Sequence, residues 1–235
     1  MTTHTIVSRD QWVTARRRLL AKEKELLRLR DKLSSERREL PWEQVDKQYV
    51  FEGPAGDETL ADLFAGRNQL IVYHFMFAPE WEAGCKSCSF WADNYNGIVP
   101  HLNQRDVSLA AISRAPLSKL QAFAARMGWS FKWVSAANTD FNYDYQVSFR
   151  PEDLAQGTAV YNYARYERSM TDLPGFSVFL KDSAGAIFHT YSTYARGLDP
   201  MNAAYQLLDL VPKGRDETDP SHPMSWVKLR DVYAT

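Results

Sequence analysis

The feature that most constrains this fold is the run QLIVYHFMF at residues 69–77, which is rich in apolar, β-branched and aromatic side chains. Such a run is typical of a strand buried on both faces of a sheet. The loop APEWEAG follows it, and then come both cysteines of the chain, Cys85 and Cys88, in one CxxC motif. The sequence therefore predicts a central strand that leads directly into a cysteine-containing helix.

Strand and helix patterns alternate along the remaining chain. Turn residues at 53–56 indicate a hairpin within 47–66, and a long polar stretch at 136–170 is predicted to be loop. The expected strands are 106–113, 130–135, 176–180 and 187–191, and the expected helices are 116–127 and 201–210. This order predicts an α/β fold, a three-layer α/β/α sandwich with a mixed central sheet.

A long helix is expected at residues 9–39. Ser8 and Gln11 have the spacing of a capping box, and Pro41 ends the helical pattern. Apolar residues recur every seven positions from Trp12 to Leu40, which gives an amphipathic arm. The arm packs on its own domain, on a second subunit as a homodimer, or on a partner protein. We divide the chain into an arm (1–42), a domain (43–212) and a C-terminal tail (213–235).

Composition excludes several classes of function. The formal net charge is −1, so no global bias towards nucleic acid or an anionic membrane exists. No apolar stretch approaches the ~20 residues that span a bilayer, and the first residues lack the pattern of a signal peptide. The sequence has no Walker, GxGxxG, GxSxG or HExxH motif. We expect a cytoplasmic protein that needs no cofactor.

The CxxC motif favours thiol chemistry. At the start of a helix, Cys85 faces unpaired backbone N–H groups and the positive end of the helix dipole, both of which stabilise a thiolate. Lys86 would add to this if its ammonium lies close. Cys88, one turn later, can attack a mixed disulfide formed on Cys85. We therefore assign Cys85 as nucleophile and Cys88 as resolving thiol.

Two other interpretations of the cysteines stay open. A zinc site needs four ligands, and no second CxxC or finger-like histidine pair is present, so we expect no metal. The strand residues His74 and His189 could approach the cysteines, although strand histidines are usually structural. The cysteines could also be inert.

Further residues are candidates to line the site. In FHTYSTYARG (188–197), strict alternation would place His189 and Tyr191 on one strand face beside the cysteines. Trp81 precedes the CxxC and Trp91 follows it, where they would shield a disulfide or simply pack.

Several segments together resemble a known family. They are RRELPW (37–42), LIVYHFMF (70–77), GCKSCSFWAD (84–93), SRAPL (113–117), RMGW (126–129), DFNYDY (140–145), FHTYSTYARG (188–197) and LLDLVPKGRDE (207–217). In this order they resemble the bacterial thioredoxin-like family called domain of unknown function 899. The resemblance implies a thioredoxin-like fold with an N-terminal helical extension, and it implies no particular reaction.

The resemblance adds two expectations. Thioredoxins place a cis-proline beside the CxxC, and Pro174 is the candidate for this position, with its isomer left open. Peroxiredoxins share the fold and use a cation near the peroxide, for which Arg114 is a candidate. We expect thiol–disulfide exchange with a disulfide-containing protein or a small thiol substrate. The alternatives are a non-catalytic binding scaffold and a peroxiredoxin-like peroxidase.

Overall fold

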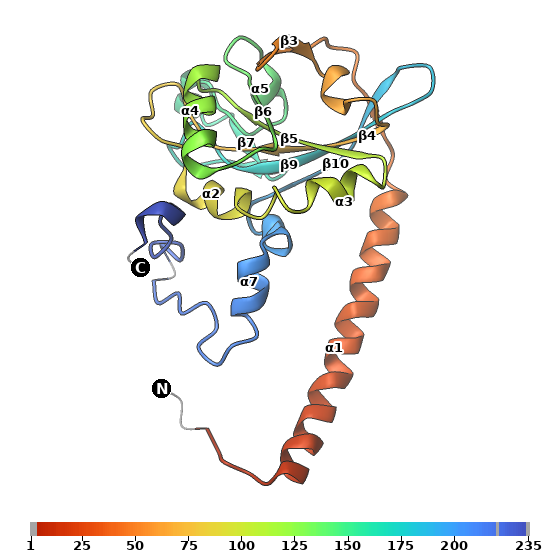
Figure 1. Cartoon of the computed structure of the whole chain (residues 1–235), viewed down its shortest axis with the longest axis vertical. Helices are drawn as coiled ribbons and strands as arrows, with labels where there is room; N and C mark the ends of the chain where they lie inside the picture. Colours follow the sequence, from red (N-terminus) through yellow and green to blue (C-terminus); the bar gives the residue numbers. More distant parts are fainter. Residues whose placement is uncertain (1–3, 220, 234–235) are drawn as a thin grey trace. The chain divides into compact units, whose positions relative to one another are not determined.

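The computed structural model describes residues 4–219 and 221–233, and an eight-stranded mixed sheet lies at its centre (Figure 1). In spatial order the strands are β1 (Glu43–Gln44), β10 (Ile187–Tyr194), β9 (Gly175–Lys181), β4 (Gln69–His74), β5 (Val107–Ser113), β6 (Lys132–Ser135), β2 (Val50–Gly53) and β3 (Gly56–Thr59). Strands β4, β5 and β6 are parallel, and β9 is antiparallel to β4. The predicted central strand is confirmed, although it ends at His74.

Short helices and one small hairpin connect these strands. The α-helices are α2 (Lys86–Ala92), α3 (Val99–Asn103), α4 (Leu117–Met127), α5 (Phe141–Asp144), α6 (Pro151–Gln156) and α7 (Ala203–Leu208). The 3₁₀ helices are η1 (Asp62–Phe64), η2 (Ala195–Met201) and η3 (Arg230–Val232), and β7 (Val160–Tyr161) pairs with β8 (Ala164–Arg165). The fold is thus α/β with a mixed sheet, as predicted.

The sheet separates two hydrophobic cores, and β4 contributes to both. Tyr73 and Phe75 face the first core, where α2 and α4 pack. Leu70 and Val72 face the second core, together with η1 and α5. Because successive side chains of a strand point to opposite faces, the two sets are separated by the sheet itself. This separation decides which residues can reach the cysteines.

Two predicted elements differ from the structure. The predicted loop 136–170 contains α5, α6 and the β7–β8 hairpin, elements of two to six residues that are too short to leave a periodic pattern. The predicted helix 201–210 is shorter, because Asn202 caps α7 by accepting a hydrogen bond from the backbone N–H of Tyr205. The chain before Asn202 forms η2 instead, with Pro200 inside it.

The chain divides into two compact units, Met1–Pro41 and Trp42–Thr235. The first unit contains α1 (Arg9–Arg38), which begins at Ser8 with the predicted reciprocal capping box to Gln11. What this helix packs against stays a prediction. Among the described residues, no helix has both the length and the apolar character needed to cross a membrane.

Candidate functional site

Cys85 lies at the point where the exit of β4 is tied to the start of α2. Its backbone N–H donates to the carbonyl of Met76 at 3.0 Å, and its own carbonyl accepts from the backbone N–H of Ser89 at 2.9 Å. Cys85 is the N-cap residue of α2, so the helix begins at the cysteines as predicted. A side chain at the preceding Gly84 would come within 2.8 Å of the Phe75 ring, which explains why glycine occupies this position.

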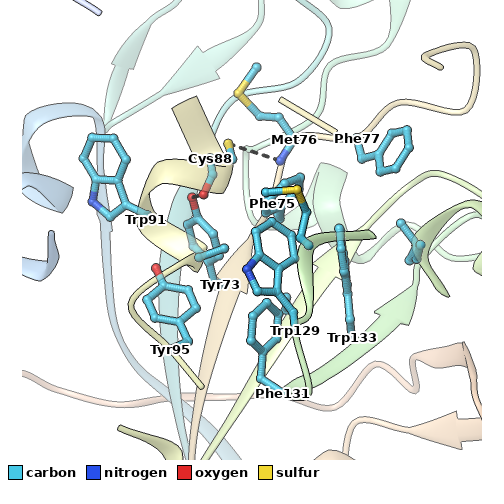
Figure 2. Close-up of a cluster of buried hydrophobic side chains, with 14 of the residues drawn as sticks. Tyr73, Phe75, Met76, Phe77, Cys88, Trp91, Tyr95, Trp129, Phe131 and Trp133 are labelled. Carbon is cyan, nitrogen blue, oxygen red and sulfur yellow. Dashed lines mark hydrogen bonds between the residues drawn. The ribbon is translucent and has the colours of Figure 1, made fainter. Parts of the chain in front are cut away.

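Cys88 is buried beneath the first turn of α2, with 2% of its surface exposed. Its Sγ accepts a hydrogen bond from the backbone N–H of Met76 at 3.5 Å, drawn as a dashed line in Figure 2. The hydroxyl of Tyr73 donates to the Cys88 carbonyl at 3.2 Å. Both thiols are free, and Cys85 is the more exposed of the two. A molecule that approaches the pair from solvent therefore meets Cys85 first.

The two thiols differ in acidity. The pKa of Cys85 is lowered to about 7, chiefly because the Cys88 thiol donates to its sulfur, with help from the backbone N–H groups of Cys88 and Ser87 and from the Ser87 hydroxyl. Burial opposes this shift but does not cancel it. Burial raises the pKa of Cys88, and the neighbouring Cys85 raises it further. The arrangement thus gives one reactive thiolate and one protonated thiol that supports it.

Aromatic rings surround the cysteine pair on the first core side of the sheet. In Figure 2 the rings of Tyr73, Phe75 and Tyr95 lie in the cluster with Cys88. The indole N–H of Trp91 donates to the carbonyl of Leu198 at 2.8 Å, so this buried tryptophan is a packing residue of the core. Trp81 is partly buried against the same cluster. The two thiols consequently lie among apolar side chains of the first core.

Lys86, the first residue of α2, contacts the C-terminal segment. Its ammonium donates to the carbonyl of Ser225 at 3.1 Å, at the far end of the chain. The pKa of Cys85 is lowered by Cys88 and Ser87, as described above. The contact joins α2 to the C-terminal segment, and an effect of the Lys86 charge on the thiolate stays a prediction.

His74 and His189 do not approach the cysteines, and each lies where the usual structural role of a strand histidine would place it. His74 stacks on Phe141 in the second core, and His189 contacts Phe179 there. Cys88 belongs to the first core, on the other side of the sheet. Neither imidazole can therefore serve the thiols.

Tyr191 and His189 do not share a face, because the register between β10 and β9 shifts at Thr190. His189 pairs with Phe179, whereas Tyr191 pairs with Val178, which points to the opposite face. Tyr191 thus lies on the face of the sheet that carries the cysteine core.

Pro174 stands directly before β9, at the edge of the sheet where β4 ends, because Gly175 pairs with His74. Pro174 therefore directly precedes a strand, as the proline of thioredoxins does. Within the described residues every peptide bond is trans, including the one that precedes Pro174. Its carbonyl accepts a hydrogen bond from the Tyr161 hydroxyl at 2.7 Å.

Arg114 follows β5, and its guanidinium is committed to an ion pair. Its Nε donates to Oδ1 of the buried Asp172 at 2.8 Å, and a second nitrogen binds the other carboxylate oxygen. Its third nitrogen donates to the Tyr143 hydroxyl at 3.1 Å. The adjacent carboxylate raises the pKa of Arg114. Each guanidinium nitrogen of Arg114 therefore already has a hydrogen-bond partner within the protein, so none is left free to bind an anionic substrate.

Some contributors to the site were not found by sequence reasoning. Ser87 lies inside the motif, and its hydroxyl was a signal that could have been used. The amide of Met76 carries no sequence signal, since every residue except proline has one.

Among the described residues, no group of three or more His, Cys, Asp or Glu side chains is placed to hold a metal ion.

Comparison with known families confirms the resemblance. A family model described as "Bacterial protein of unknown function (DUF899)" matches residues 1–233. None of the curated proteins matches the sequence.

Solved structures of peroxiredoxins are similar in fold. Peroxiredoxin Q from Xanthomonas campestris (structure F4) is 11% identical, with a TM-score of 0.50 over 70% of this chain and 93% of the other. The peroxidoxin BcpB from Mycobacterium tuberculosis is 13% identical, with a TM-score of 0.46 over 72% of this chain and 97% of the other. At 11% identity, the likeness to peroxiredoxin Q shows a thioredoxin-like and peroxiredoxin-like fold alone, and nothing about activity.

Proposed function

We propose that this chain, which belongs to the bacterial DUF899 family, is a thiol–disulfide oxidoreductase with Cys85 as nucleophile and Cys88 as resolving thiol. The observation that supports this most is the contrast between the thiols. Cys85 is partly exposed, and its pKa is lowered to about 7, while the pKa of the buried Cys88 is raised. An attacking thiol performs best when its pKa lies near the ambient pH.

The first step is attack by the Cys85 thiolate on one sulfur of a disulfide R–S–S–R. The bond between the two substrate sulfurs breaks, one RS⁻ leaves, and a mixed disulfide Cys85–S–S–R forms. The negative charge that raised the pKa of Cys88 has then gone from Cys85. The Met76 amide, which favours the Cys88 thiolate, still donates to its sulfur.

The second step is attack by Cys88 on Sγ of Cys85. Cys88 releases its proton to the thiolate that left first, and the second RS⁻ leaves as the Cys85–Cys88 disulfide forms. The substrate is reduced to RSH and RS⁻, and the cysteine pair is oxidised. A dithiol reductant returns the pair to its reduced form for the next cycle.

The two alternatives are weaker on specific grounds. A non-catalytic scaffold predicts buried and alkaline thiols, whereas the pKa of Cys85 is lowered. A peroxidase needs a cation near the nucleophile, and the guanidinium of Arg114 is instead bound to Asp172 and Tyr143. We therefore favour disulfide exchange over both.

The test is reduction of bis(2-hydroxyethyl) disulfide by dithiothreitol, with the uncatalysed rate subtracted. The wild type should accelerate the reaction, and Cys85→Ser should bring it to the uncatalysed rate. When it is incubated with the disulfide in the absence of dithiothreitol, Cys88→Ser should accumulate a mercaptoethanol adduct on Cys85 that mass spectrometry detects. Undiminished activity of Cys85→Ser would refute the assignment. Catalysed loss of hydrogen peroxide without disulfide reduction would support the peroxidase instead.

A further inference from the structure

The C-terminal segment 224–232 lies against α2, where it contacts Lys86, the residue after Cys85, and we call it the C-terminal strap. The ammonium of Lys86 donates to the Ser225 carbonyl at 3.1 Å, and the rings of Phe90 and Trp226 meet edge to face at 5.5 Å. Lys86 and Phe90 are four residues apart and share one face of the helix. The strap, at the dark blue end of the chain in Figure 1, therefore follows the face of α2 that begins one residue after Cys85.

The strap is also fixed to α4, so it is not a loose tail. Val227 is fully buried. The guanidinium of Arg230 donates to the carbonyl of Met127, the last residue of α4. Asp231 forms a two-pronged ion pair with Arg126, with distances of 2.6 and 3.1 Å. These contacts join the two helices of the first core through the strap.

The chain on the other side of Cys85 is equally restrained. Lys119 on α4 donates from its ammonium to the carbonyls of Pro79 and Trp81, each at 2.9 Å. The loop between β4 and Cys85 is thereby pinned to α4. Cys85 itself is partly buried against the first core. The nucleophile is therefore flanked by a pinned loop before it and by a strap-covered helix face after it.

We propose that the strap restricts Cys85 to small-molecule disulfides and excludes disulfides held in folded proteins. This proposal rests on the proposed exchange reaction. It follows from the size of the groups that are attached to the two sulfurs in each class of substrate. A protein disulfide carries backbone on both sides of its sulfurs, and next to Cys85 this backbone would compete for space with the strap, which contacts the adjacent Lys86. A small disulfide carries only short alkyl groups past the strap. The bonds made and broken are those of the two exchange steps given above.

The first test measures access to Cys85 without any turnover. Iodoacetamide and a maleimide carried on a large polyethylene glycol chain are reacted separately with the reduced protein, and peptide mapping follows Cys85. We expect fast labelling by iodoacetamide and labelling by the bulky maleimide that is about tenfold slower than on an unfolded reference. Equal relative rates for the two reagents would overturn the proposal, whatever the catalytic activity.

The release variants act on the strap at two separate places. Trp226→Ala with Val227→Asp removes the ring on Phe90 and places a carboxylate where a fully buried valine was. Arg230→Ala with Asp231→Ala removes the polar anchors on α4, together with the ion pair between Arg230 and Asp93 at the C-terminal end of α2, and leaves the contacts at Lys86 and Phe90 in place. Leu210→Ala, at a side chain that is 80% exposed, is the matched control. Hydrogen exchange of residues 224–232 reports whether the strap is released.

The second test compares two substrates, bis(2-hydroxyethyl) disulfide and insulin. In the wild type we expect catalysed reduction of the small disulfide and only the uncatalysed rate with insulin. Both release variants should gain insulin reduction by about tenfold, with the small-disulfide rate unchanged, and Leu210→Ala should match the wild type. Insulin reduction by the wild type, or a released strap without this gain, would overturn the proposal. If the release variants reduced neither substrate but the bulky maleimide now labelled Cys85, the exchange reaction alone would be refuted, and the role of the strap in access would stand.

Discussion

The imidazole Nε2 of His74 lies 2.9 Å from Oγ of Ser177, deep in the second core. Ser177 continues to Ser192 at 2.8 Å, and Ser192 to Nε2 of His189 at 2.7 Å. His74 also contacts the Asn142 side chain through Nδ1 at 3.3 Å. The chain of hydrogen bonds crosses β4, β9 and β10 and lets a fully buried imidazole remain in the sheet. It is a structural network on the face opposite to the cysteines.

His74 should make the fold sensitive to acid. Burial lowers its pKa from 6.5 to about 3, so between these values the unfolded chain binds one proton more than the folded protein. The contribution of His74 to the free energy of unfolding is fully present above pH 6.5. Below that pH it falls by about 1.4 kcal/mol per pH unit. In His74→Asn we expect a stability curve that is flatter by this slope between pH 6 and 4. Urea unfolding at several pH values measures it.

The control for this prediction is His222→Asn, since the His222 side chain is 79% exposed. Its slope should equal that of the wild type. His74→Asn should also lose about 1–3 kcal/mol at pH 7, because the buried network loses the hydrogen bond between the imidazole and Ser177. An unchanged pH slope in His74→Asn would contradict the assignment of the acid sensitivity to this imidazole.

His189 and Cys85 show which parts of the structure can be predicted from the sequence and which cannot. Strand β4 and the helix start at Cys85 follow from local patterns, namely an apolar run and a cysteine motif after a loop. The face on which His189 lies depends on a register shift at Thr190, and strict alternation in FHTYSTYARG predicts the wrong arrangement. A one-residue insertion in a strand has no periodic signature, so only the pairing with β9 reveals it.

The position of the strap is a second feature that could not be predicted from the sequence. Residues 213–235 are polar and lack helical or strand periodicity, so they were predicted to be a tail. In the structure Val227 is fully buried and Trp226 packs on Phe90. Such docking is set by tertiary contacts with α2 and α4 rather than by local propensity, and no pattern within the segment encodes it.

Ser87 should tune the reactivity of Cys85. Its backbone N–H and hydroxyl both favour the Cys85 thiolate, and Ser87→Ala removes the hydroxyl alone. We expect the Cys85 pKa to rise from about 7 towards that of an ordinary thiol. Each unit of rise lowers iodoacetamide labelling at pH 6 by about tenfold. The pH dependence of labelling, with peptide mapping, measures the shift.

Ser87→Thr is the matched control for Ser87→Ala, because it retains the hydroxyl. Its Cys85 titration should stay close to that of the wild type. A Ser87→Ala protein with an unchanged titration would show that the Cys88 thiol and the backbone amides suffice to stabilise the thiolate.

Gly84 should be required for the position of Cys85. A methyl group there would meet the Phe75 ring at 2.8 Å and the Phe123 ring at 2.9 Å, both in the first core. Gly84→Ala should therefore cost about 1–3 kcal/mol and slow disulfide exchange, since the backbone that carries Cys85 must shift. Gly97→Ala, where nothing lies within 4 Å, should change stability by less than about 0.5 kcal/mol. Thermal unfolding and the exchange assay test both, and equal behaviour would refute the steric argument.

Arg114 provides the final prediction, because it separates a structural cation from a catalytic one. Its guanidinium neutralises Asp172, whose side chain is 4% exposed and also accepts from Ser148 at 2.7 Å. Arg114→Ala leaves that carboxylate buried without its cation, so we expect a loss of about 3–5 kcal/mol in urea unfolding. Arg196→Ala, at a side chain that is 89% exposed, should leave stability unchanged. The Cys85 titration should be the same in the folded Arg114→Ala protein as in the wild type. If that titration instead moved upwards while stability held, Arg114 would act on the thiolate, and the peroxidase alternative would gain the cation that it needs.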